Sequence, residues 1–282
     1  MSMPLGGIET GARAIGDWIL RVRPSLEGPV LRAWYLYVRA RVRGVALKQT
    51  LTHEAPVRPF EVVWVEPGRV TQILPPFPRS KFEYAGRVMG GDWDRACVPF
   101  CDTDVYRAFE SHFERGVDWR ETAFYDRVVD EIAAGREMWG CRSREEFDER
   151  CERLDALYAS IDDQGFKTQR ELHDADGEEA AKKYRSSATE RLVQDEMAIG
   201  VGRGGELLFI DGRDRLAIAK LLDVDEIPAW ILVRHERWQE LRDAVAAGAL
   251  DPREFPARLR DHPDLPHADS GSPVGSSADA GE

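Results

Sequence analysis

The segment that most constrains the fold is residues 199–233, IGVGRGGELLFIDGRDRLAIAKLLDVDEIPAWILV. Two apolar runs flank the Arg-Gly-Gly at 203–205, a spacing typical of a β-hairpin. The second run ends at Ile210, and residues 216–222 then have the apolar spacing of a short helix. A further apolar run at 227–233 predicts another strand. The segment therefore predicts an α+β fold, with a small mixed sheet and helices packed around it.

The turn at residues 211–215, Asp-Gly-Arg-Asp-Arg, is the strongest functional signal in the sequence. Gly212 gives the backbone the freedom that a tight turn against a ligand requires. The first N–H groups of the following helix have no intrahelical acceptor, and together with the helix dipole they favour an anion. Arg213 and Arg215 lie in that first turn, where a cation is poorly placed with respect to the dipole. Two arginines at this position predict a bound anion that offsets the conflict.

Two carboxylates of the same turn are the candidate catalytic groups. Asp211 is placed to cap the helix, to hold Arg215 or to bind a metal ion. Asp214 has two interpretations. Beside a phosphate it requires a divalent cation between the two anions, whereas without a ligand it pairs with Arg213 or Lys220 on the helix surface.

The order of motifs from about residue 150 to 235 resembles the ParB/sulfiredoxin-like domain. The matching pieces are a helix that ends in Leu-Tyr-Ala-Ser-Ile at 157–161, the Gly-x-x-Arg of Gly212 and Arg215, and an Ile-Pro pair at 227–228. The resemblance implies a mixed sheet with surrounding helices and a Gly-x-x-Arg turn that holds nucleotide phosphates. In this family, partition proteins bind and hydrolyse CTP, sulfiredoxins bind ATP, and related free-serine kinases transfer a phosphoryl group.

Carried over by position, Gly212 and Arg215 match the glycine and arginine of the family. Arg213 stands where sulfiredoxins have their catalytic cysteine, so the sulfiredoxin reaction is not expected. Asp214 stands where His or Arg is usual. The stretch after the long helix lines the nucleotide site in the family, which adds two candidates here, Gln169 and Arg170. The resemblance thus implies binding of ATP or CTP, with Mg²⁺ as cofactor, and NTP hydrolysis or phosphoryl transfer as the reaction.

Three further residues are candidates for a second site. Asp92 and Asp94 lie in a Gly-Gly-Asp-Trp-Asp turn, where they either form a metal or acid/base site or cap the turn. His235 follows the last predicted strand and is either catalytic or structural.

The charge distribution bears on possible partners. The formal net charge of −12 argues against non-specific binding of duplex nucleic acid, which requires a local excess of Lys and Arg. Residues 30–47, VLRAWYLYVRARVRGVAL, nevertheless place four arginines between large apolar residues. This pattern predicts a helix that lies on a membrane or on RNA, or one docked on the domain with its arginines extended into solvent. The alternative function is therefore a non-catalytic, DNA- or RNA-associated regulatory module, and a third is a domain that only acts as a scaffold.

The composition also bears on compartment. Only six of the 39 basic residues are lysines, and an acidic, arginine-rich surface is typical of proteins from a high-salt cytoplasm. No apolar run approaches the ~20 residues of a membrane span. The start lacks the pattern of a secretory signal peptide. We therefore predict a cytoplasmic, halophilic protein.

These observations divide the chain into four parts. Prolines bracket short β-prone runs after residue 56, and Ser143 and Glu146 form a capping box that opens a long helix. The last residues are rich in Asp, Ser, Gly, Pro and Ala, a composition typical of disorder. The predicted parts are an N-terminal helical segment (1–55), an accessory α/β region (56–142), the ParB/sulfiredoxin-like domain (143–260) and a disordered tail (261–282).

Overall fold

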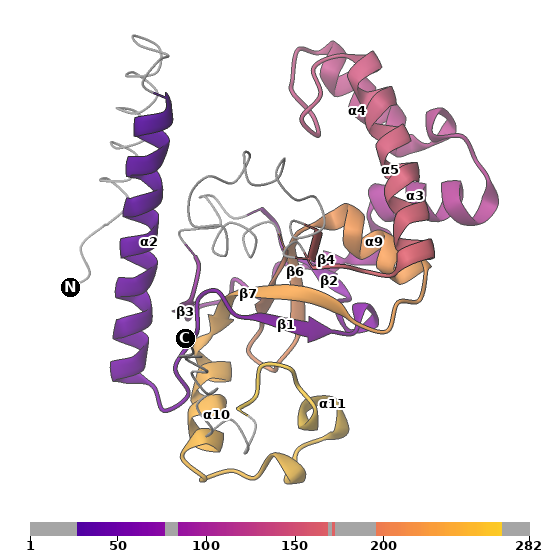
Figure 1. Ribbon diagram of the computed structural model, residues 1–282. Coiled ribbons are helices and arrows are strands. Elements are labelled where there is room, and N and C mark those ends of the chain that lie inside the picture. Colours follow the sequence, from indigo (N-terminus) through magenta and orange to yellow (C-terminus); the bar gives the residue numbers. More distant parts are fainter. Residues whose placement is uncertain (1–26, 77–83, 169–170, 173–195, 267–282) are drawn as a thin grey trace, which may run out of the picture.

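The computed structural model describes residues 27–76, 84–168, 171–172 and 196–266. Within these residues, helices surround one mixed seven-stranded sheet, which confirms the predicted α+β class (Figure 1). The strand order is β1-β7-β5-β6-β2-β4, and β3 also pairs with β7. The strands are β1 (Val62–Val65), β2 (Gln72–Ile73), β3 (Arg87–Met89), β4 (Val98–Pro99), β5 (Met197–Val201), β6 (Leu207–Asp211) and β7 (Ile227–His235).

Strand β7 organises the sheet because it is long and buried at every position. One of its edges pairs with β1 in antiparallel fashion over its first half and with β3 in parallel over its second half. The other edge pairs with β5, and β5 continues into β6 as the antiparallel hairpin expected around residues 203–205. Strand β2 then extends the sheet in parallel with β6.

Helices cover the sheet in separate groups (Figure 1). Helices α3, α4 and α5 gather on one side of the molecule, with α9 between them and the sheet. They pack around an aromatic core that includes Phe109, Trp119 and Phe147. Ser143 caps α5 as predicted, since its Oγ accepts the N–H of Glu146. The helices are α2 (Glu27–Thr52), α3 (Asp104–Arg115), α4 (Ala123–Ala133), α5 (Arg144–Gln164), α9 (Arg213–Leu221), α10 (Glu236–Ala246) and α11 (Ala257–Arg260).

The segments expected to form an accessory region and a separate domain share one sheet. Strands β1 to β4 come from residues 56–142, and β5 to β7 come from residues 143–260. The same hydrophobic core includes buried side chains from both ranges, such as Phe100 and Phe209, whose ring centroids lie 5.2 Å apart. No helix among the described residues is long and apolar enough to cross a membrane.

Residues 261–266 differ from the disordered tail that the sequence predicts from residue 261. Asp264 is buried, and its carboxylate accepts hydrogen bonds from Arg234 Nη2 at 2.6 Å and from Trp238 Nε1 at 2.8 Å. The backbone carbonyl of Asp264 accepts from Arg242 Nε at 2.7 Å. Amino-acid composition does not predict this packing, because the packing depends on one carboxylate that pairs with buried guanidinium groups and not on the polar character of its neighbours. Residues 267–282 lie outside the described residues.

Removing the carboxylate of Asp264 is expected to destabilise the protein strongly. In Asp264→Ala, the guanidinium groups of Arg234 and Arg242 stay buried without their acidic partner. We expect the free energy of unfolding to fall by about 3–5 kcal/mol, measured by urea denaturation. Asp261→Ala, an exposed carboxylate three residues earlier, is the control and should change it by less than about 0.5 kcal/mol. Equal effects of the two changes would contradict this account.

The buried ring of His262 is expected to make stability depend on pH. Its Nδ1 accepts the N–H of Asp264 and its Nε2 contacts the carbonyl of Gly205 at 3.0 Å, a pattern that requires the neutral ring. Burial lowers the pKa of His262 from its ordinary value to about 4. The unfolded chain thus takes up the proton first as pH falls, so stability is complete above about pH 6.5 and is lost progressively toward pH 4.

Chemical denaturation between pH 7 and pH 4 checks this expectation. Over that interval the free energy of unfolding of wild type should fall by about 2–3 kcal/mol more than that of His262→Gln, which lacks the titrating ring. A common slope for the two proteins would show that His262 does not carry the effect.

Candidate functional site

The turn at residues 211–215 has the strained geometry that its glycine predicts. Strand β6 ends at Asp211, and α9 begins at Arg213. Gly212 between them has φ 95°, and a Cβ there would lie 3.0 Å from the Cα of Met197. The Oδ1 of Asp211 accepts the N–H of Gly212 at 2.9 Å, so this carboxylate supports the turn. Only glycine fits both the left-handed backbone and the close approach to β5.

A cavity of about 560 Å³ opens beside this turn. Helix α5 contributes Arg150 to its lining, and the loop between α4 and α5 contributes Trp139. The two arginines of the turn lie in the same lining, so the residues that open α9 border this cavity. The lining consists of Met138, Trp139, Arg150, Leu157, Phe209, Ile210 and residues 211–215.

Asp214 forms its ion pair with a residue that the sequence did not single out. Its Oδ2 lies 2.6 Å from Nη2 of Arg150 on α5, and both side chains are largely buried. Burial raises the pKa of Asp214, and the charges of Arg150 and Arg213 act in the opposite direction. Lys220, the other expected partner, instead donates to the carbonyl of Pro67 at 2.7 Å. Asp214 therefore links α9 to α5 in the wall of the cavity.

Trp139 is held in a conformation that its residue type disfavours. It has φ 57° and the following Gly140 has φ 74°, so both central residues of this tight turn lie at positive φ, as in a type I′ turn. Asparagine or glycine is usual at such a position, and a tryptophan there is strained. Its ring lies 5.3 Å from Cζ of Arg150 and 5.6 Å from Cζ of Arg213, so cation–π contacts hold it over the cavity.

The arginines of the turn have different surroundings. Arg215 Nη1 lies 3.6 Å from the buried carboxylate of Glu196, so this arginine already faces an acid. Burial lowers the pKa of Arg213, with the charge of Asp214 acting in the opposite direction. Among the described residues, Nε of Arg213, Nε of Arg150 and Oδ1 of Asp214 have no hydrogen-bond partner although these atoms are buried. An unsatisfied buried guanidinium N–H is a ready donor for an anion.

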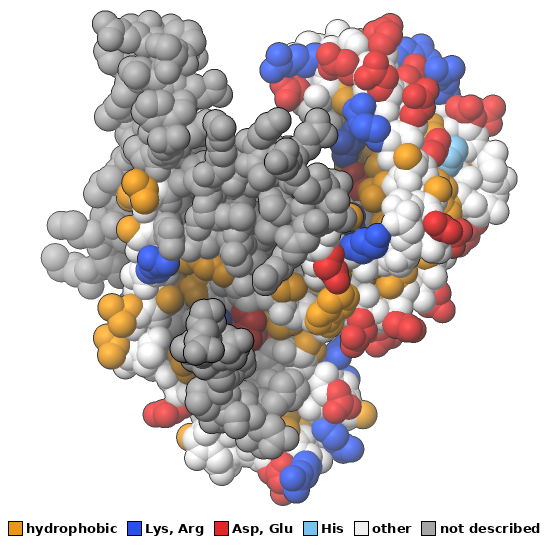
Figure 2. Space-filling view, viewed as in Figure 1, with side chains coloured by type: hydrophobic (Ala, Val, Ile, Leu, Met, Phe, Trp, Pro, Cys, Tyr) orange, Lys and Arg blue, Asp and Glu red, His pale blue; other side chains and the backbone are white. Residues whose placement is uncertain are grey.

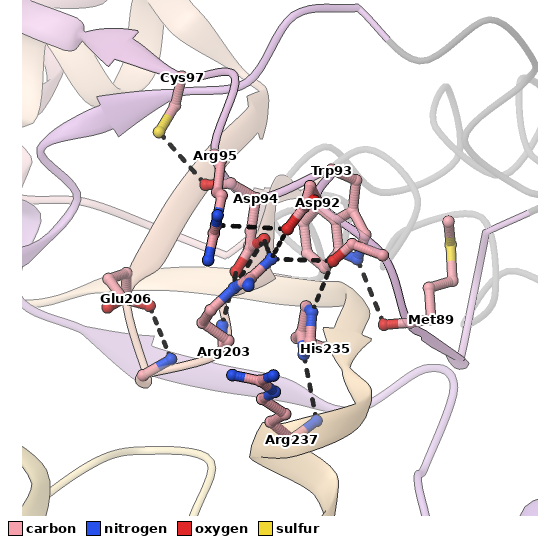
Figure 3. Close-up of polar contacts among 12 residues, drawn as sticks. Met89, Asp92, Trp93, Asp94, Arg95, Cys97, Arg203, Glu206, His235 and Arg237 are labelled. Atoms are coloured by element: carbon pink, nitrogen blue, oxygen red, sulfur yellow. Dashed lines mark hydrogen bonds and ion pairs between the residues drawn. The ribbon is translucent and has the colours of Figure 1, made fainter.

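The second group of candidates forms a separate structural network (Figure 3). Arg203 Nη2, from the β5–β6 hairpin, lies 2.7 Å from Asp94 Oδ1 and 2.8 Å from Asp92 Oδ1. Burial acts to raise the pKa of Asp94, but hydrogen bonds from Arg203 outweigh it and lower that pKa to about 2. His235 caps α10 by accepting the N–H of Arg237, and its Nε2 contacts the carbonyl of Gly91 at 3.0 Å. Asp92 and Asp94 thus bind Arg203 of the hairpin rather than cap their own turn, whereas the cap on α10 gives His235 a structural role.

The remaining candidates concern a metal and the loop after α5. Within the described residues, no group of three or more His, Cys, Asp or Glu side chains is arranged to hold a metal ion by itself. Gln169 and Arg170 lie outside the described residues. Sequence reasoning missed Trp139 and Arg150 as site residues. The one signal for Trp139 was its position next to a glycine, at 139–140.

Adding a methyl group at Gly212 is expected to destabilise the turn. In Gly212→Ala the new Cβ meets the backbone of Met197, and alanine disfavours the left-handed backbone. We expect the free energy of unfolding to fall by more than about 1 kcal/mol. Gly44→Ala, within α2 and with open space around it, should instead raise it by about 0.5–1 kcal/mol. Urea denaturation of both variants decides the matter, and a stabilised Gly212→Ala would contradict the geometry.

In comparisons with known proteins, no family model, no curated protein and no solved structure matches the chain.

Proposed function

We propose that the cavity beside residues 211–215 binds the phosphates of a nucleotide, with ATP and CTP together with Mg²⁺ as the first ligands to test. The observation that carries the proposal is that three groups able to bind an anion meet at one cavity. The N-terminus of α9, the guanidinium of Arg213 and the guanidinium of Arg150 line one cavity. The resemblance to the ParB/sulfiredoxin-like domain supports the same ligand class, since its Gly-x-x-Arg turn holds nucleotide phosphates.

Electrostatics support an anionic ligand at this position. Three arginines and two aspartates line the cavity, and Asp214 is paired with Arg150. Arg213 lies at a helix N-terminus, where the helix dipole and the burial of the side chain both disfavour its positive charge. A phosphate group offsets both unfavourable effects, because its oxygens accept hydrogen bonds from the helix amides and from the guanidinium.

The cavity also suits the remainder of a nucleotide. Its volume of about 560 Å³ lies within the range of small-molecule sites, which is roughly 300–1,000 Å³. Trp139 supplies a flat aromatic ring for a base, and stacking on such a ring tolerates different bases. Base preference therefore depends on polar groups around the ring more than on the ring itself.

Phosphoryl chemistry makes a further demand on the carboxylates. Mg²⁺ in nucleotide sites binds to one or two carboxylates and to the phosphates. Asp211 is exposed at the mouth of the turn and is the better candidate for a metal ligand or base, because Asp214 is engaged by Arg150. NTP hydrolysis or phosphoryl transfer is the reaction that these groups would serve. We further propose that the protein works in a salt-rich cytoplasm, in keeping with its acidic, lysine-poor composition.

Calorimetric titration of the full chain with ATP, CTP and GTP, each with Mg²⁺ and in molar KCl, tests the proposal. We expect saturable binding, and Arg213→Ala should weaken it by roughly tenfold or more through loss of a charge-assisted hydrogen bond. The control is Arg153→Ala, an exposed arginine one turn from Arg150 on α5, which should bind like wild type. If no nucleotide binds, or if Arg213→Ala binds like wild type, the proposal fails.

The alternative function, a module associated with nucleic acid, gives a different pattern in parallel assays. Arg41 and Arg43 lie on α2, away from the 211–215 turn (Figure 1). Salt-sensitive RNA binding that survives Arg213→Ala and is lost when Arg41 and Arg43 both become alanine would favour the alternative.

A further inference from the structure

Helix α2 has a charge opposite to that of the chain as a whole. Its sequence, EGPVLRAWYLYVRARVRGVALKQTLT, contains five basic residues and one acidic residue. The chain as a whole has a formal net charge of −12. Basic residues thus outnumber acidic ones on this element, which lies along the outside of the body (Figure 1).

One face of α2 docks on the protein. Val42 is buried and belongs to the second hydrophobic cluster, with Trp230 of β7 and Tyr84 among its members. Gln49, two helical turns further on, is buried on the same face. This face accounts for the packing of the helix against the sheet.

The opposite face carries a stripe of exposed leucines. Leu36, Leu47 and Leu51 are 67%, 64% and 78% exposed. At about 100° per residue their positions span roughly 60° of the helix surface, on the side opposite Val42 and Gln49. Half of the exposed large hydrophobic residues in the described part of the chain lie on α2, namely Leu36, Tyr37, Leu47 and Leu51.

Basic side chains border this stripe. Arg43 and Lys48 are exposed and lie on either side of it, judged by the same helical period. In Figure 2 orange side chains follow the outer edge of α2, with a blue basic side chain between them. An apolar stripe with cationic borders is the pattern of a helix that lies in the interface of a bilayer.

We propose that the outer face of α2 docks on the surface of an anionic lipid membrane. The leucines enter the boundary between headgroups and acyl chains, and the flanking cations contact the acidic headgroups. Charge selects this occupant over a second copy of the chain, since two α2 helices face to face would bring their basic residues together. Nucleic acid would use the cations but would leave the leucines in water. The helix lies on the membrane, because α2 is not apolar enough to cross it.

Vesicle flotation of the full chain tests the docking at about 0.15 M KCl, because the molar KCl of the nucleotide titration would screen the headgroup contacts. Circular dichroism at this salt first checks that the wild-type chain is folded. The chain should float with vesicles of phosphatidylcholine and phosphatidylglycerol and stay behind with phosphatidylcholine alone. Leu51→Glu should lower the bound fraction roughly tenfold, because one leucine no longer enters the apolar layer. Lys48→Gln should lower it about fivefold through loss of one headgroup contact.

Leu250→Glu is the matched control, since Leu250 is also an exposed leucine, at 42%, and lies beyond α10. It changes the net charge by the same amount and should float like wild type. Circular dichroism should show the same helix content for all variants, because the altered side chains lie in solvent. Flotation of Leu51→Glu at the wild-type level, or equal flotation with both vesicle types, overturns the proposal. So does a wild-type dimer, seen by light scattering, that Leu51→Glu converts to a monomer without any vesicle binding.

Discussion

The structure depends on the burial of β7, because this strand is shared by nearly every other part. Each of its nine residues is buried, so its backbone groups must find partners within the protein. It satisfies them with β1 and β3 on one edge and β5 on the other. The segments before residue 142 thus complete a sheet whose centre lies more than a hundred residues later. Helix α2 also joins the hydrophobic cluster of this strand, since Val42 and Trp230 belong to the same cluster.

Local pattern was enough to predict the central elements. The apolar runs around residues 203–205 formed the hairpin, Gly212 took the left-handed conformation, and Ser143 capped α5. These features depend on neighbours within a few residues, which periodicity and turn chemistry describe well. Strand pairing between distant segments, such as β3 with β7, has no such local signal.

The candidate site shows the same division between local and distant information. The turn and its arginines were visible in the sequence, but their partners were not. Arg150 lies 64 positions before Asp214, and their ion pair forms only when α5 packs on α9. Glu196 precedes β5, and its pair with Arg215 forms only when α9 packs on β5. The role of Trp139 at the cavity was not predicted, because a positive φ cannot be read from its residue type.

The packing of residues 261–266 has a consequence for how the molecule can be divided. The composition of the sequence suggests that a compact unit ends near residue 260. A fragment cut there would keep Arg234 and Arg242 in its interior while losing the carboxylate between them. It would also uncover Gly205 at the hairpin tip, whose carbonyl contacts His262. The smallest fragment that keeps these contacts and the buried Leu265 therefore extends at least to residue 265. The first residues of the final polar stretch thus belong to the folded core.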